Sequence, residues 1–144
     1  HRWWRGNGDG HRAGQLTMRR LISTGSEYER KFGYSRAVVD GDDVFVSGTT
    51  GFDYAAGTIS DDPVEQTHQT LRTIEAALVE AGAELADVVR ARYILPDAAD
   101  WDAISVVLGE AFGEIRPAAT AIIAGLIDPR MKIEIEVTAR RRKI

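Results

Sequence analysis

Residues 116–139 read RPAATAIIAGLIDPRMKIEIEVTA, and the expected fold of the whole chain is built outward from this stretch. Residues 118–125 form a compact apolar run, and residues 132–139 alternate strictly between apolar and polar side chains. Because strand side chains alternate with a period of two, both segments are predicted to be strands. Asp128-Pro129 lies between them as a turn signal, so we expect a C-terminal hairpin.

Two carboxylates, Glu134 and Glu136, fall on the same side of the second predicted strand. The other side carries Ile133, Ile135 and Val137. A buried carboxylate without a partner is too costly to remain charged. We therefore expect the glutamate side of this strand to face water, a cation or a ligand.

Composition limits the classes of function. A chain of 144 residues with 44% hydrophobic side chains fits one domain with a substantial core. The net charge of −4 gives no electrostatic reason to expect nucleic acid as a partner. The absence of cysteine excludes disulfides, thiolate catalysis and cysteine-ligated metal. No apolar run approaches the roughly 18 residues of a membrane span, and no signal-peptide pattern is present, so a cytoplasmic location is expected.

The first residues differ from the rest of the chain. Residues 1–17, HRWWRGNGDGHRAGQLT, are rich in glycine and arginine and have no periodicity. We expect an unstructured leader or extension there, followed by one domain over residues 18–144. An alternative is that Trp3 and Trp4, with their flanking arginines, contact a membrane or nucleic acid.

The remaining elements follow from periodicity and turn residues. Asp62 and Pro63 are typical of a helix start, and an apolar stripe recurs every three or four residues until Gly82. His68 lies off this stripe and has no second ligand at metal-binding spacing. The predicted strands are residues 18–23, 37–40, 44–47 and 87–95, a second helix covers about 100–113, and residues 48–57 are a glycine-punctuated loop.

Each helix has one apolar stripe, so we expect both to cover the same face of one sheet. The opposite face would then carry four charged residues of both signs, which are Arg90, Arg92, Glu134 and Glu136. An open sheet face of mixed charge in a domain of this size suggests contact with another subunit.

Several motifs taken together resemble the RidA/YjgF family, formerly called endoribonuclease L-PSP. They are GYSRAV (33–38), VFVSG (44–48), EQTHQTL (65–71), DVVRARYIL (87–95) and IEIEVTA (133–139), and the resemblance runs over residues 18–142. It implies an α+β, chorismate-mutase-like fold, in which a mixed β-sheet packs two helices on one face. It also implies a homotrimer with ligand clefts between subunits, and hydrolysis of small 2-imino or 2-enamino acids without metal or cofactor, as in 2-iminobutanoate/2-iminopropanoate deaminases.

The resemblance also assigns roles to residues. Glu134 matches the glutamate that positions the attacking water, which fits a carboxylate held beside a ligand. Tyr34 matches a cleft tyrosine, and Ser47 and Gly48 match a segment whose backbone lies near the ligand. The full set of substrate-binding candidates is Tyr34, Ser47, Gly48, Ser105, Arg116, Ala119 and Thr120.

Three positions depart from the family pattern. Ala119 stands where an arginine usually clamps the substrate carboxylate, Ala121 replaces a common cysteine, and Ser105 replaces a cleft asparagine. Losing a charge-assisted partner costs about 1.5–3 kcal/mol of binding. The chain therefore resembles an arginine-lacking subgroup. Arg116 or Arg36 could substitute, with Arg116 slightly favoured; the alternatives for both are a surface arginine or an intersubunit salt bridge.

Two other functions remain open from the sequence. The first is a non-catalytic trimer that binds a small metabolite and has lost deaminase activity with the arginine. The second is RNA cleavage, which older family names suggest but which an acidic chain without a basic, aromatic stripe disfavours.

Overall fold

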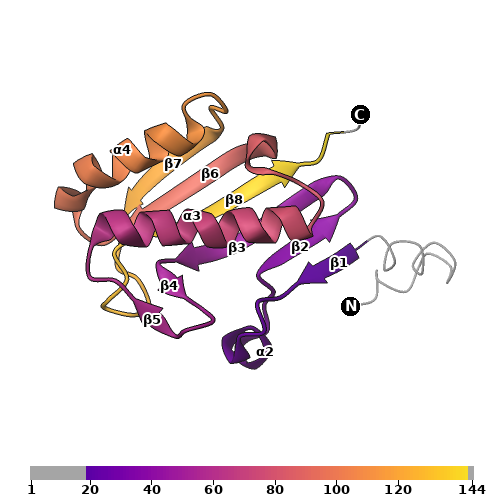
Figure 1. The fold of residues 1–144 in the computed structure, drawn as a ribbon, viewed down its shortest axis with the longest axis horizontal. Helices are drawn as coiled ribbons and strands as arrows, with labels where there is room; N and C mark the ends of the chain where they lie inside the picture. The colour runs from indigo at the N-terminus through magenta and orange to yellow at the C-terminus, as the bar shows by residue number, and fades with distance from the viewer. Residues whose placement is uncertain (1–18, 143–144) are drawn as a thin grey trace, which may run out of the picture.

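The computed structural model describes residues 19–142, and the predicted leader over residues 1–17 lies outside this range. Figure 1 shows one sheet with two long helices in front of it. The strands and helices, in chain order, are β1 (Arg19–Ile22), α2 (Glu27–Phe32), β2 (Ala37–Asp40), β3 (Asp43–Thr50), β4 (Phe52–Asp53), β5 (Thr58–Ile59), α3 (Pro63–Glu80), β6 (Val88–Leu95), α4 (Trp101–Phe112), β7 (Ala118–Ile123) and β8 (Glu134–Arg140). The short 3-10 turns Leu85–Asp87 and Ala98–Asp100 precede β6 and α4.

The main sheet is mixed, with six strands in the order β1-β2-β3-β8-β6-β7. Only the β6–β7 pair is parallel, and the other four pairs are antiparallel. A separate small hairpin pairs β4 with β5. The predicted α+β fold, a mixed sheet with helices on one face, is therefore confirmed.

The predicted C-terminal hairpin is wrong. β7 and β8 do not pair with each other, because β6 lies between them. β6, α4 and β7 form a crossover unit that places β7 parallel to β6 at the sheet edge. Residues 124–133 then carry the chain back, so that β8 enters between β3 and β6. Two strand patterns on either side of a turn signal fit a hairpin as well as they fit two strands that are separated in the sheet by a third strand.

The two long helices are placed by their caps and apolar stripes. The Asp62 carboxylate accepts a hydrogen bond from the Val64 N–H, and Pro63 occupies the first turn, as predicted. Gly82, with φ of 82°, follows the end of α3. The stripes of both helices pack on the sheet residues that point toward them, and the shared core includes Ile74, Leu78, Leu95, Ile104, Ile133 and Ile135.

Two irregularities alter the predicted strand faces. A register shift between Val88 and Arg90 buries Val88 and leaves Val89 exposed, although strict alternation with Arg90 and Arg92 would place Val88 on the open face. A second shift, between Val46 and Thr49, lets β3 continue to Thr50 through a segment predicted to be a loop. The candidate site lies at this second register shift, which is a β-bulge.

Replacing Gly51 by alanine is expected to lower the free energy of unfolding by about 1–3 kcal/mol through overpacking. A Cβ at this position would lie 2.5 Å from Gln66 Cβ and 2.8 Å from Gln66 Cα, and the helix backbone cannot yield as a flexible side chain could. Urea denaturation would measure the loss. Gly109→Ala on α4 is the matched control, because nothing lies within 4 Å of its added Cβ and no destabilisation is expected.

Candidate functional site

The two glutamates on the open face of β8 have different surroundings. Glu136 pairs with Arg92 across the β8–β6 ladder, with Arg92 Nη1 3.0 Å from Glu136 Oε1. Glu134 lies opposite Ile94 on one side and Thr50 on the other. Within residues 19–142, its carboxylate makes no ion pair at 4.0 Å or less. Glu134 is therefore the half-buried acid on this face that is free to act on a ligand or water.

The Glu134 carboxylate lies directly over Gly48. A Cβ added at residue 48 would lie 2.4 Å from Glu134 Oε2, so the missing side chain makes room for the acid. Burial raises the pKa of Glu134, the charge of Glu136 raises it further, and Arg36 opposes both effects. A carboxylate with a raised pKa is a better proton acceptor than an ordinary surface glutamate.

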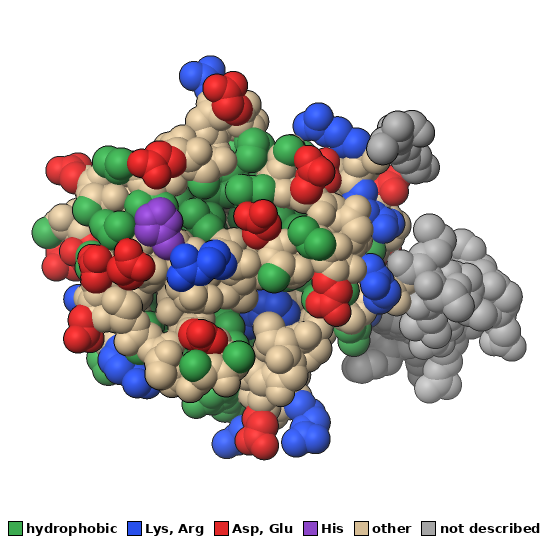
Figure 2. All heavy atoms as spheres, viewed as in Figure 1, with side chains coloured by type: hydrophobic (Ala, Val, Ile, Leu, Met, Phe, Trp, Pro, Cys, Tyr) green, Lys and Arg blue, Asp and Glu red, His purple; other side chains and the backbone are tan. Residues whose placement is uncertain are grey.

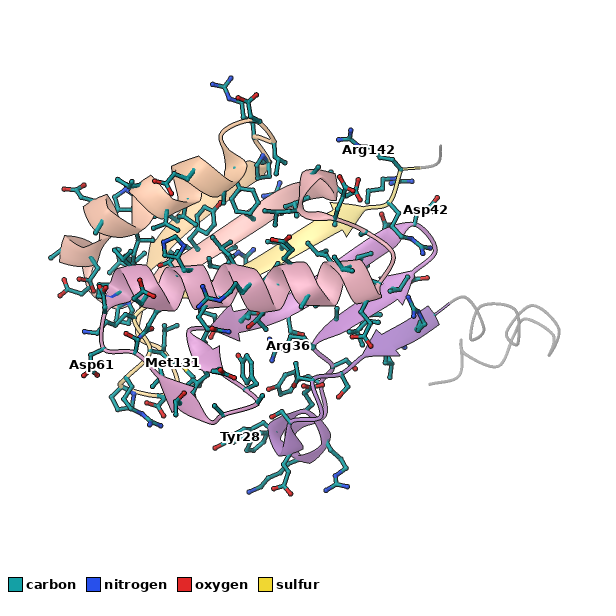
Figure 3. All side chains as sticks on the ribbon, in the orientation of Figure 1. Tyr28, Arg36, Asp42, Asp61, Met131 and Arg142 are labelled. Carbon is teal, nitrogen blue, oxygen red and sulfur yellow. The ribbon has the colours of Figure 1, made fainter. Side chains whose placement is uncertain are left out.

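Arg36 is the buried cation beside this acid. Its side chain is 1% exposed, and its Nη1 donates to the Gly48 carbonyl and to Thr49 Oγ1, each at 2.8 Å. Its Nε has no hydrogen-bond partner among the described residues. Figure 3 shows Arg36 in the space between α3 and the turn that joins β4 and β5. A charge that is buried without a carboxylate at 4.0 Å or less is costly unless other groups stabilise it.

Two tyrosine rings stabilise this cation. The Arg36 Cζ lies 4.9 Å from the Tyr54 ring centre and 5.7 Å from that of Tyr34. Gly33, with φ of 76°, ends α2, and the following Tyr34 N–H donates to the Glu29 carbonyl. Burial raises the pKa of Tyr34, and the positive charge of Arg36 opposes this effect. Tyr34 is 38% exposed, so it is the more accessible aromatic member of the cluster.

Tyr54 was missed by the sequence analysis, which placed it in a glycine-punctuated loop. Its hydroxyl lies 3.3 Å from both the Thr50 amide nitrogen and Thr50 Oγ1, which holds the β4–β5 turn against the end of β3. The available signal was a pair of aromatic residues, Phe52 and Tyr54, inside a loop whose other residues are small or polar. Its stacking on Arg36 depends on a contact between distant turns, which the local pattern does not contain.

Ser47 belongs to the scaffold of this cluster. Its N–H donates to the Arg36 carbonyl at 2.9 Å, and its Oγ donates to the Ser35 carbonyl at 2.5 Å. Its own carbonyl accepts from Thr49 Oγ1 at 2.8 Å. These bonds fix the bulge that presents Gly48 to Glu134. The amide and hydroxyl of Ser47 are consequently occupied within the chain.

The other predicted ligand contacts lie away from Glu134. Glu134 is level with Ile122 near the end of β7, whereas Arg116 precedes the first residue of that strand. Ala119 and Thr120 lie on the exposed edge strand β7, where Thr120 is level with the Arg92–Glu136 pair. Ser105 lies on α4, across the sheet, and its Oγ donates to the Asp102 carbonyl at 2.8 Å. Of the two arginines considered, Arg36 is the one beside Glu134 within the chain.

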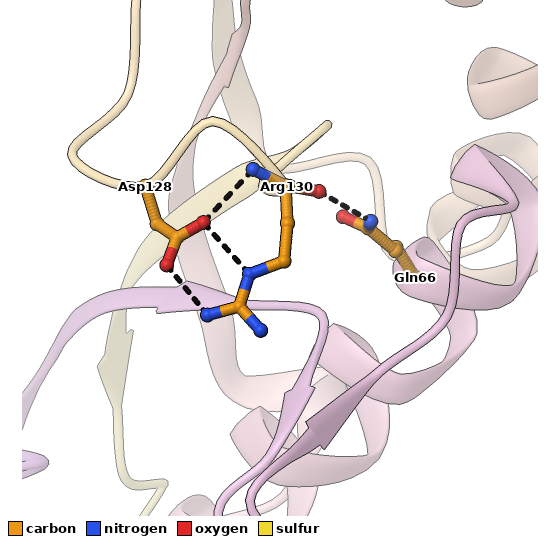
Figure 4. A network of polar contacts seen from close by, with 3 residues as sticks. All are labelled: Gln66, Asp128 and Arg130. Atoms are coloured by element: carbon orange, nitrogen blue, oxygen red, sulfur yellow. Dashed lines mark hydrogen bonds and ion pairs between the residues drawn. The ribbon is translucent and has the colours of Figure 1, made fainter.

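The return loop that leads to Glu134 is held by a buried glutamine. Gln66 is 0% exposed; its Nε2 donates to the Ser60 and Arg130 carbonyls at 2.7 and 2.8 Å. Its Oε1 accepts from the Lys132 N–H at 2.8 Å. Figure 4 shows the adjoining pair, in which Asp128 accepts three hydrogen bonds from Arg130. These bonds from Arg130 lower the pKa of Asp128 to about 2.

Glu134 should make stability depend on pH. Its pKa in the folded chain is raised above the usual 4.5, so the folded state binds the proton more tightly. Stability is therefore lost as pH rises from the usual value through the raised one. Glu134→Gln is expected to increase the melting temperature at pH 7 and to give no increase well below pH 4.5. Glu136→Gln, which loses an exposed ion pair, is the control and should give no increase at neutral pH.

Neither a metal centre nor a membrane-spanning helix is found within residues 19–142. No group of three or more His, Asp or Glu side chains in this range is arranged to hold a metal ion. None of the helices in this range is both long enough and apolar enough to span a bilayer.

Comparison with known proteins identifies the family. The family model described as Endoribonuclease L-PSP matches residues 24–141. The structure of Rv2704 from Mycobacterium tuberculosis, described as a member of the YjgF/YER057c/UK114 family, is 45% identical, with a TM-score of 0.77 over 85% of this chain and 98% of that one. The Streptomyces coelicolor protein SCO2049 is 38% identical over 85% of this chain and 92% of its own length.

A relative with a named activity is more distant. The 2-iminobutanoate/2-iminopropanoate deaminase of Capra hircus is 32% identical over 85% of this chain and 90% of its own length. The matched segment spans every strand and helix from α2 to β8 and includes the whole Arg36–Glu134 cluster. The chain is therefore a member of the RidA/YjgF family, the family also described as endoribonuclease L-PSP.

Proposed function

We propose that this protein hydrolyses small imines or enamines derived from amino acids to the 2-oxo acid and ammonia. The observation that carries the proposal is the half-buried Glu134 carboxylate, which has a raised pKa, no ion-pair partner among residues 19–142 and a glycine beneath it. The name of the Capra hircus relative supports the reaction class. The lack of the family's usual arginine at Ala119 supports membership of an arginine-lacking subgroup.

The proposed reaction uses one water molecule. Glu134 accepts a proton from the water as its oxygen attacks the imine carbon. The carbon–nitrogen double bond becomes a single bond, and the nitrogen takes up a proton from solvent to give a carbinolamine. Glu134 then gives its proton to the nitrogen, the carbon–nitrogen bond breaks so that ammonia leaves, and the hydroxyl proton passes to solvent as the carbon–oxygen double bond forms. An enamine substrate first takes up a proton on carbon to give the imine.

Substrate carboxylate binding is assigned to the positive potential of Arg36. The guanidinium is fixed by Gly48 and Thr49, so its charge adds potential at the site without the side chain moving. Toward Glu134, Arg36 acts through this potential rather than by direct contact, because its Nη1 is already held by the Gly48 carbonyl, and Tyr34 forms the accessible wall. This arrangement is our proposal for how a chain with Ala119 could still hold a carboxylate.

We also propose a homotrimer in which the cleft is completed by a neighbour. All six residues of β7 are exposed in the single chain, and the open face carries exposed Leu21, Phe45 and Ile122. An uncovered edge strand is a common site of association. Arg116, Thr120 and Ser105 would then reach the cleft from the adjacent subunit. Light scattering is expected to give three times the 15.8 kDa chain mass, and a monomer would remove the shared cleft.

Ammonia release from freshly generated 2-aminoacrylate or 2-iminobutyrate tests the reaction. The purified protein should raise the rate above that of buffer and of heat-inactivated protein. A rate equal to buffer would overturn the proposed reaction. The second candidate, a non-catalytic metabolite-binding trimer, is favoured by Ala119. It predicts thermal stabilisation by small oxo acids without any turnover.

A further inference from the structure

A pocket of about 370 Å³ lies between α3, the end of β1 and the turn after β4. Its walls include Ile22, Gln69, Thr73 and Ala76, and Arg36 forms part of its lining. Figure 2 shows a hollow below α3 with basic atoms at its bottom, at the place where Figure 3 labels Arg36. The volume is within the range of small-molecule sites. Glu134 does not line this pocket, so the pocket shares Arg36 with the proposed reaction centre but not the acid that acts on water.

The lining has the chemistry of a carboxylate site. Arg36 is a permanently charged group that is 1% exposed, with its Nε unpartnered and no carboxylate within 4.0 Å in the described range. Its Nη1 makes two hydrogen bonds, and both go to neutral oxygens. Glu29 and Glu134 act on this charge only from beyond that distance, so an anion that enters beside the guanidinium would stabilise it further.

The rest of the wall limits the size and charge of that anion. Asp53 and Glu80 line the same pocket together with Arg36 and Arg72, so the formal charge of the lining is balanced. A ligand with several negative charges would be repelled by the two acids. Ile22 and Ala76 add apolar surface that suits a short aliphatic chain.

We propose that this pocket binds a small monocarboxylate at Arg36, on the helix-covered side of the sheet and apart from Glu134. Two sources share this chemistry, a plain carboxylic acid and an amino acid whose ammonium group faces Glu80 or Asp53. Arg36 would then act on two ligands, the monocarboxylate in this pocket and the substrate beside Glu134. The reason is that the same guanidinium also holds the Gly48 carbonyl beneath Glu134.

Amide NMR titration of the full chain with propionate, alanine and inorganic phosphate tests the proposal. We expect saturable shifts centred on Thr73, Ala76 and Ala77 with propionate or alanine, with a Kd of about 1 mM for ligands this small. Tighter binding of alanine would identify the amino-acid source, and equal or tighter binding of propionate the plain acid. Saturable shifts with phosphate alone, or with none of the three, would overturn the proposal.

A pair of variants separates this pocket from the reaction centre. Ala76→Phe fills the pocket from an exposed position on α3 and should weaken binding at least tenfold. Val79→Phe, on the same helix but not in the lining, should leave binding unchanged. Ala76→Phe should also retain the rate of ammonia release, because residue 76 lines this pocket and Glu134 does not. Unchanged binding in Ala76→Phe would overturn the assignment even where the proposed reaction is observed.

Discussion

Glu134→Gln is expected to lower the rate of ammonia release by a factor of about 10²–10⁴, the usual contribution of a general base. Glutamine preserves the shape over Gly48 but cannot accept a proton from water. The loss should fall on kcat, because the amide can still make neutral contacts with the substrate. In the unmodified protein, activity should fall as pH drops through the raised pKa of Glu134, since the ionised form is the active one.

Glu136→Gln is the matched control for this result. Glu136 lies two residues along the same strand and is paired with Arg92 on the exposed face. It should retain the wild-type rate within a few-fold. Gly48→Ala, which forces the Glu134 carboxylate aside without changing its chemistry, should reduce the rate while keeping the fold. Equal rates for Glu134→Gln and the wild type would show that this acid is not the base.

Replacing Gln66 by leucine is expected to lower the free energy of unfolding by about 3–5 kcal/mol, because three backbone groups lose their partners. These groups are the Ser60 and Arg130 carbonyls and the Lys132 N–H. Leucine matches glutamine closely in size, so the loss would report hydrogen bonding rather than a cavity. Denaturant unfolding with an unchanged m-value would measure it.

The control for Gln66 is available one turn away on the same helix. Gln69 accepts hydrogen bonds from Arg72 at the surface, so Gln69→Leu should change stability by no more than about 0.5 kcal/mol. Gln66→Glu should also destabilise strongly, because a carboxylate would then face two carbonyl oxygens. A loss below about 1 kcal/mol in Gln66→Leu would mean that these backbone groups find other partners, such as water. Because Lys132 leads directly into β8, Gln66 also helps to position Glu134.

The site illustrates what the local pattern could and could not predict. Alternation in residues 132–139 correctly separated the glutamate face from the core face. The same pattern treated Glu134 and Glu136 alike, yet only Glu136 lies level with an arginine across the ladder. That difference depends on which residue of β6 each glutamate meets, and register between distant strands is not encoded in either strand alone.

The sequence by itself determined the two long helices with their core faces and most strands of the main sheet, and through its motifs it indicated the family and its α+β class. These features depend on local propensity, capping and periodicity, which act over a few neighbouring residues. Tertiary structure alone decided that β6 separates β7 from β8, and that Arg36 rather than Arg116 lies beside Glu134. It also decided that Tyr54 stacks on Arg36. The physical reason is that these contacts join segments far apart in the chain, where packing and buried charge, not local preference, select the partner.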